Sequence, residues 1–290
     1  YEIRDIRVYD VYDADGHLTE HLAPPAPISK FLEQPFWFVR DSAFTPDFVT
    51  NFGEAEKLLE KEIGEGNFAG GMLFTTTAVQ NMLEASEGLY VPDYNETITK
   101  DNFYLKAQLY AEKDFFPGSI QKKRFLGSVM NQMLINLSQV SLPELMTQVE
   151  KSLNEKQMVV YSRDRDMQQY LEKNYWSGRT LKPKCNLPAA INCILDFVFP
   201  VDANLGVNKA NFFVSRPTKM QIAINSQGII RNTVTLVYTN NSYDDIFPGG
   251  PYKNYMQLMT PPNSQIEQIT VDDTQLTDYD ETNFEYKVVG

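Results

Sequence analysis

Residues 119–137, SIQKKRFLGSVMNQMLINL, form the most regular helical pattern in the chain. Apolar side chains recur there with a period near 3.6 and fall on one stripe, which predicts an amphipathic helix against a core. The members of this stripe are Leu126, Val129, Met130, Met133, Leu134 and Leu137. Other helical patterns alternate with short strand patterns at 68–74 and 157–161. This interleaving predicts an α/β domain over residues 1–200.

A second stretch changes the pattern. Residues 219–239, KMQIAINSQGIIRNTVTLVYT, contain two strand patterns joined by Ser226-Gln227-Gly228, which is typical of a β-hairpin. Strand character continues at 256–259 and 266–271, and no helical pattern follows. We therefore expect an all-β, sandwich-like domain over 206–290 that is incomplete at its C-terminal end. The predicted fold class is α/β followed by all-β.

Charge limits the classes of partner. The 290 residues carry a formal net charge of −12, which argues against nucleic-acid binding because that needs a basic surface. No run approaches the length of about 18 apolar residues that a membrane span requires. Residues 120–184 nevertheless hold 11 basic and 6 acidic side chains. Such a segment indicates either a local anion site or an ordinary solvated basic face.

Histidine and cysteine are scarce. His17 and His21 are the only two histidines, so a multi-histidine zinc site or a histidine triad has too few members. Cys185 and Cys193 are close enough in sequence to form a disulfide, which would stabilise the fold by about 2–3 kcal/mol. In a secreted protein such a pair is typically bridged, and in a reducing compartment it stays as two thiols. Both alternatives are open at the level of sequence.

Arg40-Asp41 is the first candidate site. A guanidinium can grip a phosphate with two hydrogen bonds, and a neighbouring carboxylate can hold a divalent cation. The same pair can also form an ordinary ion pair. Asp47 is either a second carboxylate near that metal or the N-cap of the next helix, and its position directly before Phe48 favours the cap.

Lys122, Lys123 and Arg124 are the second candidate site. Positive charge in the first turn of a helix opposes the helix dipole, and a bound anion relieves that conflict. Alternatively, the lysine stems cover apolar surface while their ammonium groups stay in water. The aromatic segment 31–38 is a candidate wall for a lipid tail, or simply part of the core.

Several phrases in this chain resemble, in order, the domain of unknown function 4012 family of bacterial envelope proteins. The resemblance covers nearly the whole chain and implies an extracellular protein that is tethered to the membrane through a segment outside this chain. The phrases are Asp10-Val11-Tyr12-Asp13, Pro24-Pro25-Ala26-Pro27, Val39-Arg40-Asp41-Ser42, Thr45-Pro46-Asp47-Phe48, Ile98-Thr99-Lys100-Asp101-Asn102, the stretch DANLGVNK at 202–209 and the stretch FPGGPYKNY at 247–255.

The α/β part is also similar to the LytR-CpsA-Psr domain, whose proteins transfer lipid-pyrophosphate-linked glycopolymers to the cell wall. This resemblance implies catalytic roles for Arg40 and Asp41, anion binding by Arg40, Lys122, Lys123 and Arg124, and Mg²⁺ held by Asp41 and Asp47. It also implies that an arginine-bearing strand precedes residue 1, so that the α/β domain is truncated at its N-terminus. One departure is Ala69, where the family usually has aspartate before Gly70.

Two main functional hypotheses follow. In the first, an extracellular envelope protein binds a lipid-pyrophosphate-linked glycan or cell-wall polymer and, if it is an enzyme, transfers it by metal-assisted phosphotransfer. In the second, the same scaffold is a non-catalytic surface protein for structure, adhesion or assembly. A soluble lipid or carbohydrate carrier is a third alternative.

Overall fold

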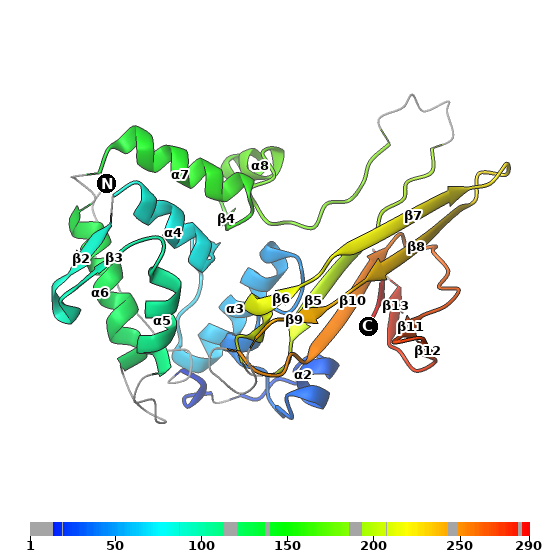
Figure 1. Cartoon of the computed structure of the whole chain (residues 1–290), viewed down its shortest axis with the longest axis horizontal. Coiled ribbons are helices and arrows are strands. Elements are labelled where there is room, and N and C mark those ends of the chain that lie inside the picture. The colour runs from blue at the N-terminus through cyan, green and yellow to red at the C-terminus, as the bar shows by residue number, and fades with distance from the viewer. Residues whose placement is uncertain are drawn as a thin grey trace. The chain divides into compact units, whose positions relative to one another are not determined.

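The computed structural model describes residues 14–18, 20–86, 88–112, 121–136, 140–185, 193–206, 208–242, 249–283 and 286–290 (Figure 1). It divides the chain into two compact units. Unit 1 consists of Tyr1–Pro24 and Phe36–Thr180, and unit 2 consists of Pro25–Pro35 and Leu181–Gly290. No helix among the described residues is long and apolar enough to cross a membrane.

The boundary between the units lies near residue 180, earlier than the expected 200–206. Side-chain contacts explain why the residues before 200 belong with the strands that follow. The Asn232 amide donates a hydrogen bond to Asp196 at 2.7 Å, and the Phe197 and Tyr286 rings are 5.8 Å apart. Unit 2 also takes in Pro25–Pro35, where the ring of Phe31 lies 5.9 Å from that of Tyr255.

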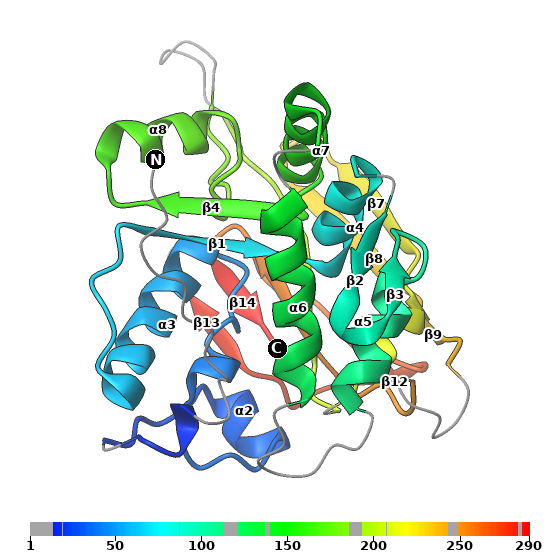
Figure 2. The same cartoon turned by 90° about the vertical axis from the view of Figure 1, so that its left-hand side faces the viewer.

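Unit 1 mixes helices with short antiparallel strand pairs, as the alternating pattern predicts. Its helices are α3 (Phe48–Ile63), α4 (Thr76–Glu84), α5 (Phe103–Glu112), α6 (Gln121–Asn136), α7 (Leu142–Asn154) and α8 (Arg165–Lys173), with 3-10 turns η1 (Val39–Asp41) and η2 (Pro92–Tyr94). Its strands are β1 (Gly70–Phe74), β2 (Leu89–Val91), β3 (Glu96–Ile98) and β4 (Met158–Ser162). Figure 2 shows β1 and β4 side by side, and the hydrogen-bond register makes them antiparallel.

Helix α3 supports the candidate site, and local sequence sets both of its ends. The Asp47 carboxylate accepts a hydrogen bond from the Thr50 N–H at 2.8 Å, which caps the N-terminus. Gly64 ends the helix in the left-handed conformation with φ of 74°, which glycine adopts without steric cost.

The hydrophobic core of unit 1 lies where α4, α5 and α6 meet the β2–β3 hairpin. Phe125 is completely buried, and its ring lies 5.1 Å from that of Tyr94 and 4.7 Å from that of Tyr110. The buried cluster contains Leu83, Leu89, Val91, Ile98, Phe103, Ala107, Phe125 and Val129.

The face that α6 buries agrees only in part with the predicted stripe. Val129, a member of the stripe, is 3% exposed, and Met133 packs against the core. Leu126 and Met130 are instead 44% and 43% exposed, and Phe125, which was not assigned to the stripe, is 0% exposed. Apolar residues occupy two adjacent rows along this helix. The helical period of 3.6 residues is therefore compatible with burial of either row. The two tyrosine rings around Phe125 decide the choice, because they supply the aromatic surface on which it packs.

Unit 2 is rich in β-structure, as predicted. Besides helix α2 (Ala26–Phe31) and the 3-10 turn η3 (Ala210–Phe213), its elements are β5 (Phe199–Asn204), β6 (Val214–Ser215), β7 (Thr218–Ile224), β8 (Ile230–Leu236), β9 (Thr239–Asn240), β10 (Asn254–Thr260), β11 (Thr270–Val271), β12 (Thr274–Gln275), β13 (Glu281–Asn283) and β14 (Lys287–Val289). A four-stranded sheet has the order β13-β14-β10-β5.

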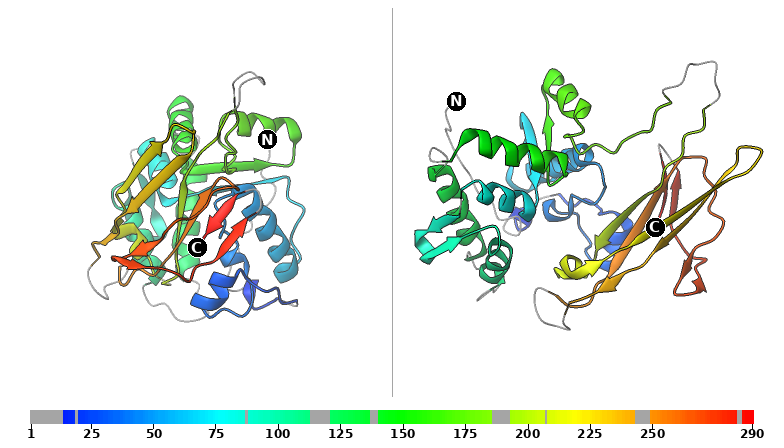
Figure 3. Two further views of the ribbon diagram at one scale, coloured as in Figure 1. Left: turned by 90° about the vertical axis from the view of Figure 1, so that its right-hand side faces the viewer. Right: turned by 45° about the horizontal axis from the view of Figure 1, so that its top comes forward.

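The predicted hairpin is confirmed as β7 and β8. These strands pair antiparallel from Thr218 opposite Leu236 to Ile224 opposite Ile230, and Figure 3 shows them in yellow as a long two-stranded ribbon. Gly228 has a φ of 79° in the connecting turn, a conformation that most other residues avoid.

Candidate functional site

The Arg40-Asp41 pair lies in the short turn η1. The guanidinium of Arg40 forms an ion pair with Asp15, and its Nε lies 3.4 Å from Oδ2 of Asp41. It also lies over the ring of Phe38, with Cζ 4.6 Å from the ring centroid. The Arg40 side chain is 22% exposed. The Arg40 guanidinium therefore already contacts two carboxylates and one aromatic ring.

A third carboxylate belongs to the same cluster. Glu62 on α3 is only 2% exposed, and its Oε1 accepts a hydrogen bond from the Val39 N–H at 2.9 Å. Arg40 acts electrostatically on this carboxylate, so three acidic groups share one guanidinium. We call Asp15, Arg40, Asp41 and Glu62 the Arg40 cluster.

Burial controls the titration of this cluster. Loss of water raises the pKa of the Asp41 carboxyl above its ordinary value, against the opposing attraction of Arg40. Burial likewise raises the pKa of Glu62, although the Val39 hydrogen bond and Arg40 both act in the other direction. With all groups ionised, the cluster carries more negative than positive charge, which repels a phosphate.

Asp47 caps helix α3, which is the alternative to the metal-ligand role that the resemblance implied. Its Oδ1 accepts the Thr50 N–H at 2.8 Å, and its Oδ2 accepts the Thr180 N–H at 2.9 Å. Both oxygens are therefore occupied by backbone donors, which matches the N-cap alternative. Within the described ranges, no group of three or more His, Cys, Asp or Glu side chains is arranged to hold a metal ion.

The basic start of α6 is only partly described. Lys122 and Lys123 lie within the helix, but their side chains are outside the described part of the chain. Arg124 is exposed and lies close enough to Tyr94 to affect its phenol, whose pKa is raised mainly by burial and lowered by Arg124. Helix α6 packs against α5 and β2. Arg124 therefore lies beside the β2–β3 hairpin, whereas Arg40 and Asp41 lie beside α3.

The aromatic segment 31–38 is divided between the two units. Phe31 belongs to unit 2, while Phe36 and Trp37 belong to unit 1. Phe36 stacks on His21 with ring centroids 3.7 Å apart, and the Trp37 N–H donates to the Leu22 carbonyl at 2.8 Å. These contacts use His21 in packing. The lipid-groove interpretation of this segment gains no support from them.

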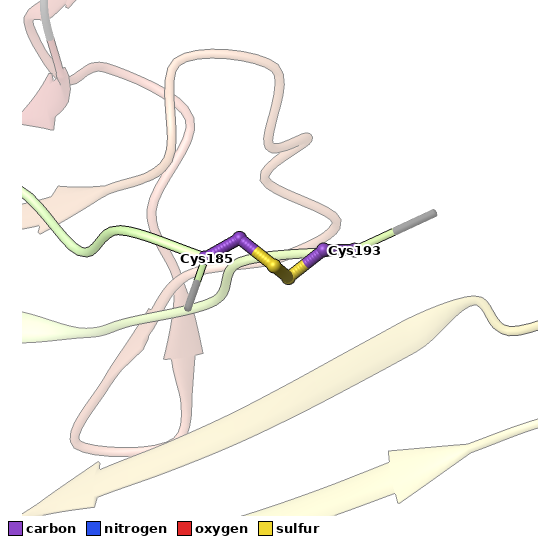
Figure 4. The surroundings of a disulfide bond; sticks show 2 residues. All are labelled: Cys185 and Cys193. Carbon is purple, nitrogen blue, oxygen red and sulfur yellow. A yellow bond between two sulfur atoms is a disulfide. The ribbon is translucent and has the colours of Figure 1, made fainter. Parts of the chain in front are cut away.

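In unit 2, Cys185 and Cys193 form a disulfide bond with their Cα atoms 6.2 Å apart (Figure 4). The bridge closes a separation of eight residues and leaves neither sulfur as a thiol. Of the two alternatives that the sequence left open, the structure therefore shows the bridged one.

Sequence reasoning missed two members of the Arg40 cluster and a pocket beside Trp37. Asp15 is 25 residues from Arg40 and Glu62 is 23 residues from Val39, so no local motif connects them. The pocket is lined by Leu22, Ala23, Trp37, Glu54, Lys57, Glu60 and Lys61. The spacing of Glu54, Lys57 and Lys61 along one helical face was the available signal.

Substitution of Glu62 tests the electrostatics of the cluster. Glu62→Gln keeps an acceptor for the Val39 N–H but removes the titrating group. The pKa of Glu62 is raised in the folded wild-type protein, so the folded protein keeps a proton that the unfolded chain has already released. The free energy of unfolding of the wild type therefore falls as the pH rises above 4.5, the ordinary pKa of a glutamate. The variant should lack this fall, so its stability relative to wild type should increase between about pH 4 and about pH 7.

Urea denaturation at several pH values, followed by tryptophan fluorescence, measures this difference. Both tryptophans, Trp37 and Trp176, belong to unit 1. Glu150→Gln on the exposed part of α7 is the matched control, for which no pH-dependent difference is expected. A relative stability of Glu62→Gln that decreases with pH would contradict the assigned environment.

Comparisons with known proteins give no independent identification. No family model, no curated protein and no solved structure matches this chain.

Proposed function

We propose that this protein is a non-catalytic cell-surface protein of a bacterial envelope, with a role in structure, adhesion or assembly. The observation that supports this most strongly is the commitment of Arg40 to Asp15, Asp41 and Phe38. A group that must bind a pyrophosphate needs an open, net positive environment. The Arg40 cluster instead offers a guanidinium surrounded by carboxylates.

The contacts of this cluster have a structural purpose. Arg40 connects the turn η1 to Asp15, and Glu62 connects the same turn to α3. A phosphate at this guanidinium would compete with the Asp15 and Asp41 carboxylates that already pair with it. Asp47 is likewise occupied in holding the start of α3 and the Thr180 backbone. Arg40, Asp41 and Asp47, for which the resemblance implied catalytic or metal-binding roles, thus each make contacts that hold the fold together.

The extracellular location is part of the proposal and has two supports. The Cys185–Cys193 disulfide is typical of oxidising compartments, such as the outside of the cell. The resemblance to the domain of unknown function 4012 family also implies an envelope protein, with a tether in a segment outside this chain.

The second candidate function is binding, with possible transfer as an enzyme, of a lipid-pyrophosphate-linked glycan. The observation that favours it is the basic first turn of α6, where Lys122 and Lys123 precede the exposed Arg124. In that candidate the anion would lie at the start of α6, because helix N-termini favour negative charge. The chain offers no described ligand set for the accompanying metal.

Calorimetric titration of geranyl pyrophosphate, with and without Mg²⁺, separates the two candidates. The wild type, Arg40→Ala and Arg124→Ala proteins are compared after circular dichroism has shown that each is folded. The non-catalytic proposal predicts no saturable heat in wild type under either condition. Saturable binding that is lost in either arginine variant would overturn it, and the affected arginine would identify the anion site.

A further inference from the structure

The pocket beside Trp37 has a size and a lining that suit a small ligand. Its volume is about 680 Å³, within the range of small-molecule sites. One side is formed by α3 through Glu54, Lys57, Glu60 and Lys61. The other lining residues are Leu22, Ala23 and Trp37. Every lining residue belongs to unit 1, so the pocket is complete within one compact unit.

Trp37 is the aromatic residue that lines this pocket. Its backbone N–H donates to the Leu22 carbonyl at 2.8 Å, which ties the two parts of the wall together. Its Nε1–H donates to the Asp41 carbonyl at 3.3 Å. An indole has only this one polar hydrogen, so a ligand beside Trp37 would contact the apolar ring and not a free N–H donor. A flat aromatic ring suits ligands with an apolar face.

The charged side chains of the pocket are balanced. Two lysines and two glutamates line it. Lys57 pairs with Glu54 at 2.9 Å, and Lys61 pairs with Glu20, which is outside the lining. Within the described chain no ion-pair partner is found for Glu60, which is exposed and available as an acceptor. This balance disfavours a phosphate or another multiply charged anion, and it favours a neutral ligand with many hydroxyl groups.

We propose that the Trp37 pocket binds a neutral oligosaccharide. A pyranose ring has an apolar face of C–H groups that can stack on the indole, and hydroxyl groups at its edge that can bond to Lys57, Glu60 and Lys61. The proposal rests on the surface-adhesion form of the proposed function, to which it adds a ligand class. It needs no metal and no chemical step, because recognition alone is the activity.

Fluorescence titration of a single-tryptophan protein tests this assignment. Trp176→Phe leaves Trp37 as the only tryptophan. Cellotriose, maltotriose and N-acetylchitotriose are the probes, and inorganic pyrophosphate is the anionic comparison. At least one sugar should change the Trp37 emission saturably with a Kd on the order of 1 mM or tighter, and pyrophosphate should not.

Two variants identify the pocket. Glu60→Gln weakens the acceptor and should reduce affinity by about tenfold, whereas Glu150→Gln on α7 should leave affinity unchanged. Trp37→Ala, measured by calorimetry, should abolish binding while circular dichroism shows an intact fold. If Trp37→Ala does not fold, Glu60→Gln still decides the question.

Two results would overturn the pocket assignment. One is the absence of any saturable response to all three sugars up to about 20 mM, and the other is a response to pyrophosphate in their place. Neither result bears on the Arg40 cluster, whose test uses geranyl pyrophosphate with arginine variants. Failure of the pocket assignment is therefore distinguishable from failure of the proposed function.

Discussion

Replacing Phe125 with alanine is expected to lower the free energy of unfolding of unit 1 by about 3–5 kcal/mol. Phe125 is completely buried, and its ring lies against Tyr94 and Tyr110. Truncation removes a large apolar side chain from a close-packed core and leaves a cavity that the two tyrosine rings can fill only in part. Urea denaturation followed by Trp37 and Trp176 fluorescence measures the effect in unit 1.

Leu126 is the matched control, because it is the next residue on the same helix and is 44% exposed. Leu126→Ala should change stability by no more than about 0.5 kcal/mol. Phe125→Leu keeps much of the volume and should cost about 1 kcal/mol, which covers the case in which the alanine variant does not fold. A larger effect at Leu126 than at Phe125 would show that α6 buries the stripe predicted from sequence instead.

Arg40→Ala is the second large effect, with an expected loss of about 2 kcal/mol at neutral pH. Removal of the guanidinium takes away the positive charge that acts on Asp15, Asp41 and Glu62 together. The value is smaller than for a fully buried ion pair, because the Arg40 side chain is 22% exposed and water screens part of the repulsion. The stacking on Phe38 is also lost.

The pH dependence gives this prediction a specific signature. Without Arg40, the carboxyl pKa values should rise further in the native protein. Native protein then retains protons that the unfolded chain has released, so the stability of the variant falls more steeply with pH than that of wild type. The loss should therefore be smaller at about pH 4 than at about pH 7.

Arg179→Ala is the matched control for this second effect. Arg179 pairs with Glu172 at 2.9 Å, but both side chains are well exposed, so its removal should cost at most about 1 kcal/mol. If Arg40→Ala costs no more than Arg179→Ala, or even stabilises the protein, then Arg40 is held for a ligand and not for the fold. That outcome would favour the anion-binding candidate.

The sequence was sufficient for local structure with strong signals. The β7–β8 hairpin follows from two alternating runs around Gly228, and the end of α3 follows from Gly64. These features depend on backbone conformations and side-chain periods that neighbouring residues set by themselves. The mixed α/β character of the first part and the β-rich character of the second could be predicted for the same reason.

Features that join distant residues required the tertiary structure. Both faces of α6 satisfy the helical period, and only the positions of Tyr94 and Tyr110 select the row of Phe125. Taken alone, the Arg40-Asp41 pair is typical of a phosphate-binding motif. In the folded protein Asp15 and Glu62, which are distant in sequence, lie beside it. A short motif specifies which groups are present. Charge balance and burial, which decide what those groups can do, depend on neighbours that only folding brings together.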